Sequence, residues 1–201
     1  FLYIYYNFIL YMSAKITLLL VLALFSVSTS PIIAKALVGV NAVAISFWRM
    51  LFAAFILWFY SFLKPQGKMK VKSNIRKTVI AGVLLGIHFA LFFSAIKITQ
   101  IANATFLGTL APFFTLIVEI FIFKRSFDSK VLIGLLFTLF GSLIILGYKF
   151  DFGTSYTLGN LLALSCSVCL GIAFIISEKV RESESTVVYT RTLYLTAAIT
   201  L

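Results

Sequence analysis

The side chains able to do chemistry in this sequence are few, and most of them lie inside long apolar runs. Two cysteines, Cys166 and Cys169, form the C-x-x-C pattern of a thiol redox or metal site. The pattern falls within an apolar run, and the chain has a single histidine, His88, to complete a metal site. We therefore interpret the cysteines as packing residues and predict no metal, no cofactor and no enzymatic activity, an intramembrane enzyme being the least favoured alternative.

Polar and small residues form a stripe along the apolar run 101–123. The stripe consists of Thr105, Gly108, Pro112, Thr115 and Glu119. Spacings of three and four place these residues on one face of a single helix. Pro112 has no N–H, so the Gly108 carbonyl lacks its helical donor, which a membrane tolerates only beside another group or a cavity. Glu119 is a functional candidate because it is ionisable inside a membrane span; its place near the end of the run leaves snorkelling open.

The neighbouring runs hold three further candidates. Asn160 and Ser167 share one helix face of the run 157–178, and the two cysteines point away from that face. His88 lies opposite a stripe of small residues that suits close helix packing. For His88 two interpretations remain open: a histidine bonded into the bundle, or a substrate contact. These candidates predict a substrate cavity lined by the first, third, fourth and sixth spans.

Arg49 is a full positive charge seven residues inside the apolar run 42–63. Such a residue costs about 3 kcal/mol at mid-membrane and less near an interface. One interpretation is a side chain that snorkels to the headgroups. The other is an arginine that faces the bundle and holds an internal acceptor or an anionic group of the substrate.

The elements that position these residues are membrane spans. Of the 201 residues, 62% are hydrophobic and 11% are charged, whereas soluble domains are about half apolar and about a quarter charged. Runs long enough to cross a bilayer occur at 14–36, 42–63, 78–97, 101–123, 130–148 and 157–178. A seventh begins near Val187. The sequence thus predicts an all-α polytopic membrane protein with about six to seven transmembrane helices.

The net charge of +11 is concentrated in alternate loops. The segment 64–77 between the second and third runs carries six Lys and Arg and no acid. Because positive residues in short loops mark the cytoplasmic side, we expect a cytoplasmic N-terminus. Charge distributed this way implies the lipid bilayer, with its anionic headgroups, as a partner and excludes nucleic acid.

The first residues are set apart from the rest. Residues 1–11 are interpreted as an upstream extension, with Met12 as the start of the protein. A secretory signal beginning at Met12 is an alternative, but the apolar sequence continues to spanning length where a cleavable signal would end.

An internal repeat is visible at an offset of about 140 residues. "SFWRMLF" at 46–52 is echoed by "VYTRTLY" at 188–194, which aligns Arg49 with Arg191. Five spans lie within the offset, so the second copy enters the membrane from the other side. Inverted repeats of this kind are typical of secondary transporters.

The chain resembles the EamA-like type of the drug/metabolite transporter superfamily. The resemblance rests on "IIAKAL", "SFWRMLFAA", "HFALFFSAIKITQIANATFLGTLAPFFTLI" and the glycine-led "IGLLFTLFGSLIILG". It implies inverted five-helix repeats, with 12–150 as the first repeat and 151–201 as the truncated start of the second. Members resemble ten-helix exporters or exchangers of amino acids, metabolites and other small solutes in bacterial inner or organelle membranes. Where many relatives have Gly-Glu after the fourth helix, this chain has Lys124 and Arg125.

The resulting hypothesis is a multi-pass protein of the bacterial inner membrane that exports or exchanges a small polar metabolite by alternating access. The alternative is a non-transporting membrane subunit or assembly factor that packs through its small-residue faces. The expected partners are a small-molecule substrate and, to complete the transporter, either a second copy in a homodimer or the missing second-repeat helices.

Overall fold

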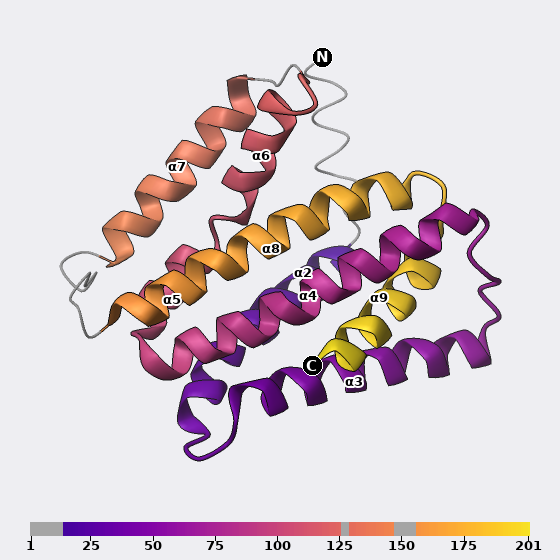
Figure 1. The fold of residues 1–201 in the computed structure, drawn as a ribbon, viewed down its shortest axis with the longest axis horizontal. Helices are drawn as coiled ribbons and strands as arrows, with labels where there is room; N and C mark the ends of the chain where they lie inside the picture. Colours follow the sequence, from indigo (N-terminus) through magenta and orange to yellow (C-terminus); the bar gives the residue numbers. More distant parts are fainter. Residues whose placement is uncertain (1–13, 126–128, 147–155) are drawn as a thin grey trace.

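The protein is a helical bundle in which successive spans run in opposite directions (Figure 1). The computed structural model describes residues 14–125, 129–146 and 156–201, and within these ranges the regular structure is helical. The helices are α2 (Ala14–Ala36), α3 (Ala42–Leu63), α4 (Lys72–Ile98), α5 (Ile101–Gly108), α6 (Ala111–Phe121), α7 (Ser129–Leu146), α8 (Thr157–Arg181) and α9 (Thr186–Thr200). Five segments are long and apolar enough to cross a membrane, counting α5 and α6 as one. The predicted all-α polytopic fold is therefore confirmed.

Short connections join the helices at the two ends of the bundle. The α3–α4 and α8–α9 loops share one end, here called the α3–α4 end, and the α2–α3 and α4–α5 connections share the opposite end (Figure 1). Asn41 caps α3 by accepting a hydrogen bond from the Val43 N–H at 2.8 Å. Ser185 caps α9 in the same way. Such caps satisfy backbone donors that a helix leaves unpaired at its start.

Helix α4 forms the centre of the bundle, packed against α8, α9 and α3 (Figure 1). Gly82 and Gly86 of α4 face α9. A Cβ on Gly82 would lie 2.6 Å from the Thr196 Cβ, and one on Gly86 would lie 2.9 Å from the Ala197 carbonyl oxygen. The small-residue stripe is therefore a helix-packing face, as the sequence predicts, and its partner is α9.

The fourth span is not one continuous helix. We expected a single helix over 101–123, but α5 ends at Gly108 and α6 begins at Ala111. The Thr109 N–H turns back to the Thr105 and Phe106 carbonyls, and Pro112, which has no N–H to donate, stands in the first turn of α6. Because proline fits the first turn of a helix and not its interior, the helix is interrupted here and a new one begins.

The two helices that correspond to each other in the predicted repeat, α3 and α9, both pack against α4. They also pack against each other. The division into 12–150 and 151–201 stays a prediction. Its boundary and the whole of 1–11 lie outside the described residues.

The outside of the bundle is apolar. Phe25, Phe62 and Phe137 have exposed fractions of 69%, 82% and 72%. Apolar surface of this extent is stable against lipid and not against water, which fits spans embedded in a bilayer.

Candidate functional site

Part of the predicted stripe lines a groove between α6 and α8. It has a volume of about 270 Å³ and is lined by Pro112, Thr115, Glu119, Phe174, Ile175 and Glu178. The helix break turns α6 so that its polar residues face α8. Gly171 of α8 lets α6 approach, since a Cβ there would lie 3.1 Å from the Ala111 carbonyl oxygen. The groove thus combines two carboxylates, a hydroxyl and an apolar wall.

Arg125 bridges the two carboxylates of the groove. Its Nη1 lies 3.1 Å from Glu178 Oε1 and 3.6 Å from Glu119 Oε1. All three side chains remain partly exposed. Lys124, with φ of 49°, adopts the left-handed conformation that ends α6 and turns Arg125 back toward Glu119. Sequence reasoning noted Arg125 as a departure from the family pattern and did not foresee this pairing.

The rest of the stripe lies elsewhere. Thr105 is exposed, whereas Gly108 is buried, and a Cβ on it would lie 3.0 Å from the Phe92 ring. Gly108 therefore lies in a packing contact between α5 and α4. The expected common face holds for Pro112, Thr115 and Glu119, because the break at 109–110 separates them from the residues of α5.

His88 is bonded into the bundle. Its Nδ1 donates to the Cys166 carbonyl oxygen at 2.8 Å, since a carbonyl can only accept. Its ring stacks on Phe92 at a centroid distance of 6.0 Å. This internal hydrogen bond joins α4 to α8, and a substrate contact of His88 stays a prediction.

Asn160 lies in a buried polar cluster at the start of α8. Its Oδ1 accepts hydrogen bonds from Thr99 Oγ1 at 3.0 Å and from Asn103 Nδ2 at 3.2 Å. Ser167, also buried, bonds the Leu164 carbonyl of its own helix at 2.8 Å. Sequence reasoning missed Thr99 and Asn103, although an Asn within an apolar run is a detectable signal.

Lys35 is a third residue that sequence reasoning missed. Its Nζ donates to the carbonyls of Ile96 at 2.7 Å and Thr99 at 2.9 Å, at the C-terminal end of α4. A cation at this position satisfies unpaired carbonyls and opposes the negative end of the helix dipole. It fixes α2 to the α4–α5 connection.

Arg49 faces the bundle. Its Nη1 donates to Ser30 Oγ of α2 at 2.6 Å, and its guanidinium carbon lies 5.1 Å from the Phe89 ring centroid and 4.9 Å from that of Phe93. Two aromatic faces and one hydroxyl hold the cation between α2, α3 and α4. A planar guanidinium with further N–H groups can bind a carboxylate or phosphate here.

With this geometry established, the chain can be compared with known proteins. The model of the EamA-like transporter family matches residues 14–147, more than half of the 201 residues. The chain belongs to the EamA-like transporter family. No curated protein and no solved structure matches it. The chain is therefore a multi-pass membrane protein of a family of transporters. Members of this family lie in the lipid bilayer and move small solutes across it, and they are not enzymes.

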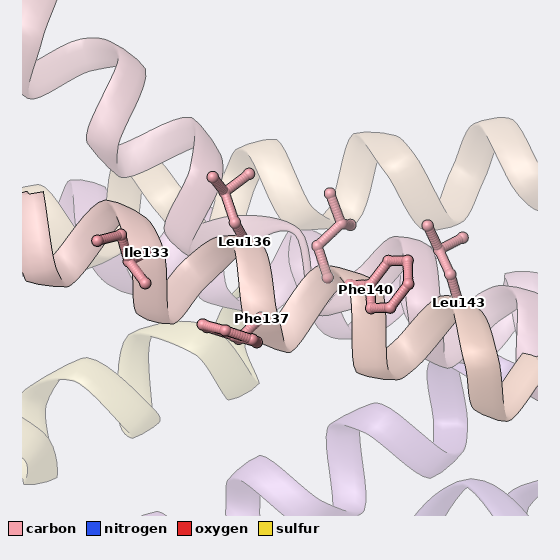
Figure 2. Close-up of a pocket in the computed structure, with 6 residues that line it drawn as sticks. Ile133, Leu136, Phe137, Phe140 and Leu143 are labelled. Atoms are coloured by element: carbon pink, nitrogen blue, oxygen red, sulfur yellow. The ribbon is translucent and has the colours of Figure 1, made fainter.

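A second hollow of this EamA-like transporter is larger than the groove, but it is wholly apolar. It has a volume of about 420 Å³ and is lined along α7 by Ile133, Leu136, Phe137, Leu139, Phe140 and Leu143 (Figure 2). No polar group there could orient a polar solute. A lipid acyl chain suits this surface, and the groove between α6 and α8 is the better candidate site.

The cysteines of this EamA-like transporter are free thiols. Cys166 is buried, with its Sγ 3.0 Å from the Ala163 carbonyl oxygen of the same helix. Within the described ranges, no three His, Cys, Asp or Glu side chains form a group that could hold a metal ion.

Proposed function

We propose that this protein is a secondary transporter that exports or exchanges a small polar metabolite, such as an amino acid, by alternating access. The observation that carries the proposal is the broken fourth span, which opens onto the Glu119–Glu178 groove. Discontinuous spans with polar linings are the usual way in which transporters build solute sites.

In this proposal two places contact the solute. Glu119 and Thr115 in the groove bind its cationic or hydrogen-bonding groups, while Arg49, between α2, α3 and α4, binds an anionic group. Arg125 closes the groove when it is empty. Its ion pairs lie on partly exposed side chains and are therefore weak enough to break in each cycle.

The charge distribution supports an orientation for the proposed cycle. The exposed cations of 64–77 lie at the α3–α4 end, which we assign to the cytoplasm of a bacterial cell. The groove then opens on the cytoplasmic side, and the N-terminus is cytoplasmic.

One observation weighs against a non-transporting subunit. That alternative needs small-residue faces free for a partner, and the face of Gly82 and Gly86 is already filled by α9. The groove, by contrast, carries charges that helix packing does not require.

A flux assay tests the proposal. The full protein in sealed proteoliposomes is offered a panel of radiolabelled amino acids and related metabolites, and at least one should accumulate above the level of protein-free vesicles. Ile117→Ala, which alters an exposed apolar residue on the other side of α6, is the matched control and should keep that flux. Flux at the protein-free level for every solute would refute transport.

A further inference from the structure

Arg191 is a buried cation that forms no ion pair with an acid among the described residues. It lies in the first half of α9 and is 9% exposed. Its Nη2 donates to the Gly67 carbonyl oxygen at 2.6 Å, and its guanidinium carbon lies 4.6 Å from the Trp58 ring centroid. Its Nε is buried without a hydrogen-bond partner, and no carboxylate of the described residues forms an ion pair with it.

These surroundings compensate only part of the charge. A guanidinium cannot lose its proton in a protein, so burial cannot be relieved by neutralisation. A neutral carbonyl and an aromatic face stabilise the cation, but a buried charge is normally paired. The missing partner is an acceptor with negative charge, and the orphaned Nε–H beside the bonded Nη2 offers the two-pronged geometry that an oxyanion takes.

The same surroundings occur around Arg49. Each arginine lies on an aromatic face, each has one hydrogen bond to a neutral oxygen at 2.6 Å, Ser30 Oγ or Gly67 O, and neither has a carboxylate partner among the described residues. The two helices occupy corresponding places in the predicted inverted repeat. The same arrangement occurs twice, towards opposite ends of the bundle. This repetition favours a shared function of the two arginines over two independent packing contacts.

The cover over Arg191 can open without unfolding a helix. Gly67 belongs to the α3–α4 loop, has φ of 76°, and a Cβ there would meet nothing within 4 Å. Farther along the loop, the Glu184 carboxylate accepts hydrogen bonds from the Lys70 and Val71 N–H groups, each at 2.9 Å at its closest. The loop is therefore anchored at 70–71, whereas there is open space on the Cβ side of Gly67.

We infer that Arg191 is an oxyanion-binding site that takes a carboxylate or phosphate group at the α3–α4 end of the bundle. The inference rests on the proposed function in one respect: in a transporter, Arg191 and Arg49 are two stations for the same anionic group. The oxyanion belongs either to a soluble solute or to an anionic lipid headgroup.

Trp58 provides a direct readout of binding. The chain has two tryptophans, so Trp48→Phe leaves Trp58, against which Arg191 lies, as the reporter. The full protein with this substitution is reconstituted in phosphatidylcholine vesicles and titrated with inorganic phosphate or acetate, with chloride at equal ionic strength as the reference. A second set of vesicles contains phosphatidylglycerol and receives no added oxyanion.

A saturable change in Trp58 fluorescence with phosphate or acetate in phosphatidylcholine assigns the site to a soluble anion. A change confined to phosphatidylglycerol vesicles assigns it to a headgroup. In either case Arg191→Gln should abolish the change, and Arg181→Gln, which removes an exposed charge from the end of α8, should keep it. No saturable change in any arm, or an unchanged response in Arg191→Gln, overturns the inference.

Arg191→Lys keeps the inference testable if Arg191→Gln does not fold. It retains the charge but loses the planar fork, so the half-saturating anion concentration should rise at least fivefold. An unchanged half-saturating concentration contradicts the oxyanion site. Because this assay measures binding, it can succeed where the flux assay fails, and the reverse also holds.

Discussion

Two groups of carboxylates lie near the α3–α4 end of the bundle, and they differ in burial and in hydrogen bonding. Glu184 is 6% exposed and accepts hydrogen bonds from the Lys70 and Val71 N–H groups and from Asn74 Nδ2. Glu119 and Glu178 are partly exposed and share the partly exposed side chain of Arg125.

The difference separates a structural acid from the acids that we propose to bind the solute. Val71 at the start of α4 has no side-chain cap of its own, so the N–H groups there depend on Glu184. Main-chain donors hold that carboxylate in one place. A partly exposed ion pair contributes only about 0–1 kcal/mol, which makes the groove acids easy to rearrange around a solute. The predictions below test this contrast.

The largest effect is expected for Glu184→Ala. Loss of the carboxylate removes the acceptor of the Lys70 and Val71 N–H groups, just before α4, and releases the α3–α4 loop. The thermal midpoint in detergent should fall farther than for any other substitution proposed here. Glu184→Gln keeps one acceptor oxygen and should fall between Ala and wild type. A midpoint equal to wild type in Glu184→Ala would remove the structural half of the comparison.

The next effect is expected on flux. Glu119→Gln keeps the shape of the groove and removes its charge, so transport should fall at least tenfold while the free energy of unfolding changes by less than about 1 kcal/mol. Glu182→Gln, at an exposed loop position, is the control and should transport normally. Unchanged flux and an unchanged pH profile in Glu119→Gln would reduce the groove to a packing seam.

Acid should distinguish the two groups further. Hydrogen bonding from the Lys70 N–H lowers the pKa of the Glu184 carboxyl below its ordinary value of 4.5. A lowered pKa contributes stability above the ordinary value, and that stability is lost as the pH falls through the lowered pKa. Thermal midpoints should therefore be flat from about pH 8 to about pH 5 and decline below about pH 4.5. Glu184→Gln should lose part of this decline; an identical decline in both proteins contradicts the assignment.

A smaller effect is expected for Arg125→Gln. Removing the bridge frees Glu119 and Glu178, and we expect flux to change by about two- to fivefold with a change in stability of at most about 1 kcal/mol. Raising the ionic strength should narrow the difference from wild type, because salt screens exposed pairs. Arg76→Gln, at another exposed cation, should be silent. A large loss of stability in Arg125→Gln would show that the pair is structural after all.

The smallest effect is expected for Lys124→Gly. Lys124 holds a left-handed conformation that costs a non-glycine residue about 1 kcal/mol. Glycine removes this strain, although its freedom in the unfolded chain offsets part of the gain. The protein should become more stable by about 0.5 kcal/mol with flux unchanged. A lower midpoint would mean that the left-handed turn at the end of α6 is wrong.

The sequence by itself located the helices that are long and apolar enough to cross a membrane. The runs 14–36 and 42–63 coincide with α2 and α3 because an apolar stretch of this length has one stable place, the hydrocarbon core. The stripe of Gly82 and Gly86 was also recognisable from the sequence as a helix-packing face, since only small residues allow two helices to approach so closely. Local spacing was sufficient because each of these properties belongs to a single helix.

Only the tertiary structure decided how polar residues from different helices meet. Pro112 indicated an irregularity in the fourth span. The structure shows that the helix breaks at 109–110, which divides the stripe and leaves Thr105 outside the groove. Arg125 found its partner Glu178 some fifty residues away, and Glu184 found Lys70 more than a hundred residues away. Helical periodicity fixes the face on which a side chain lies but not the neighbour it meets. That neighbour depends on how the helices cross, which packing of the whole bundle sets.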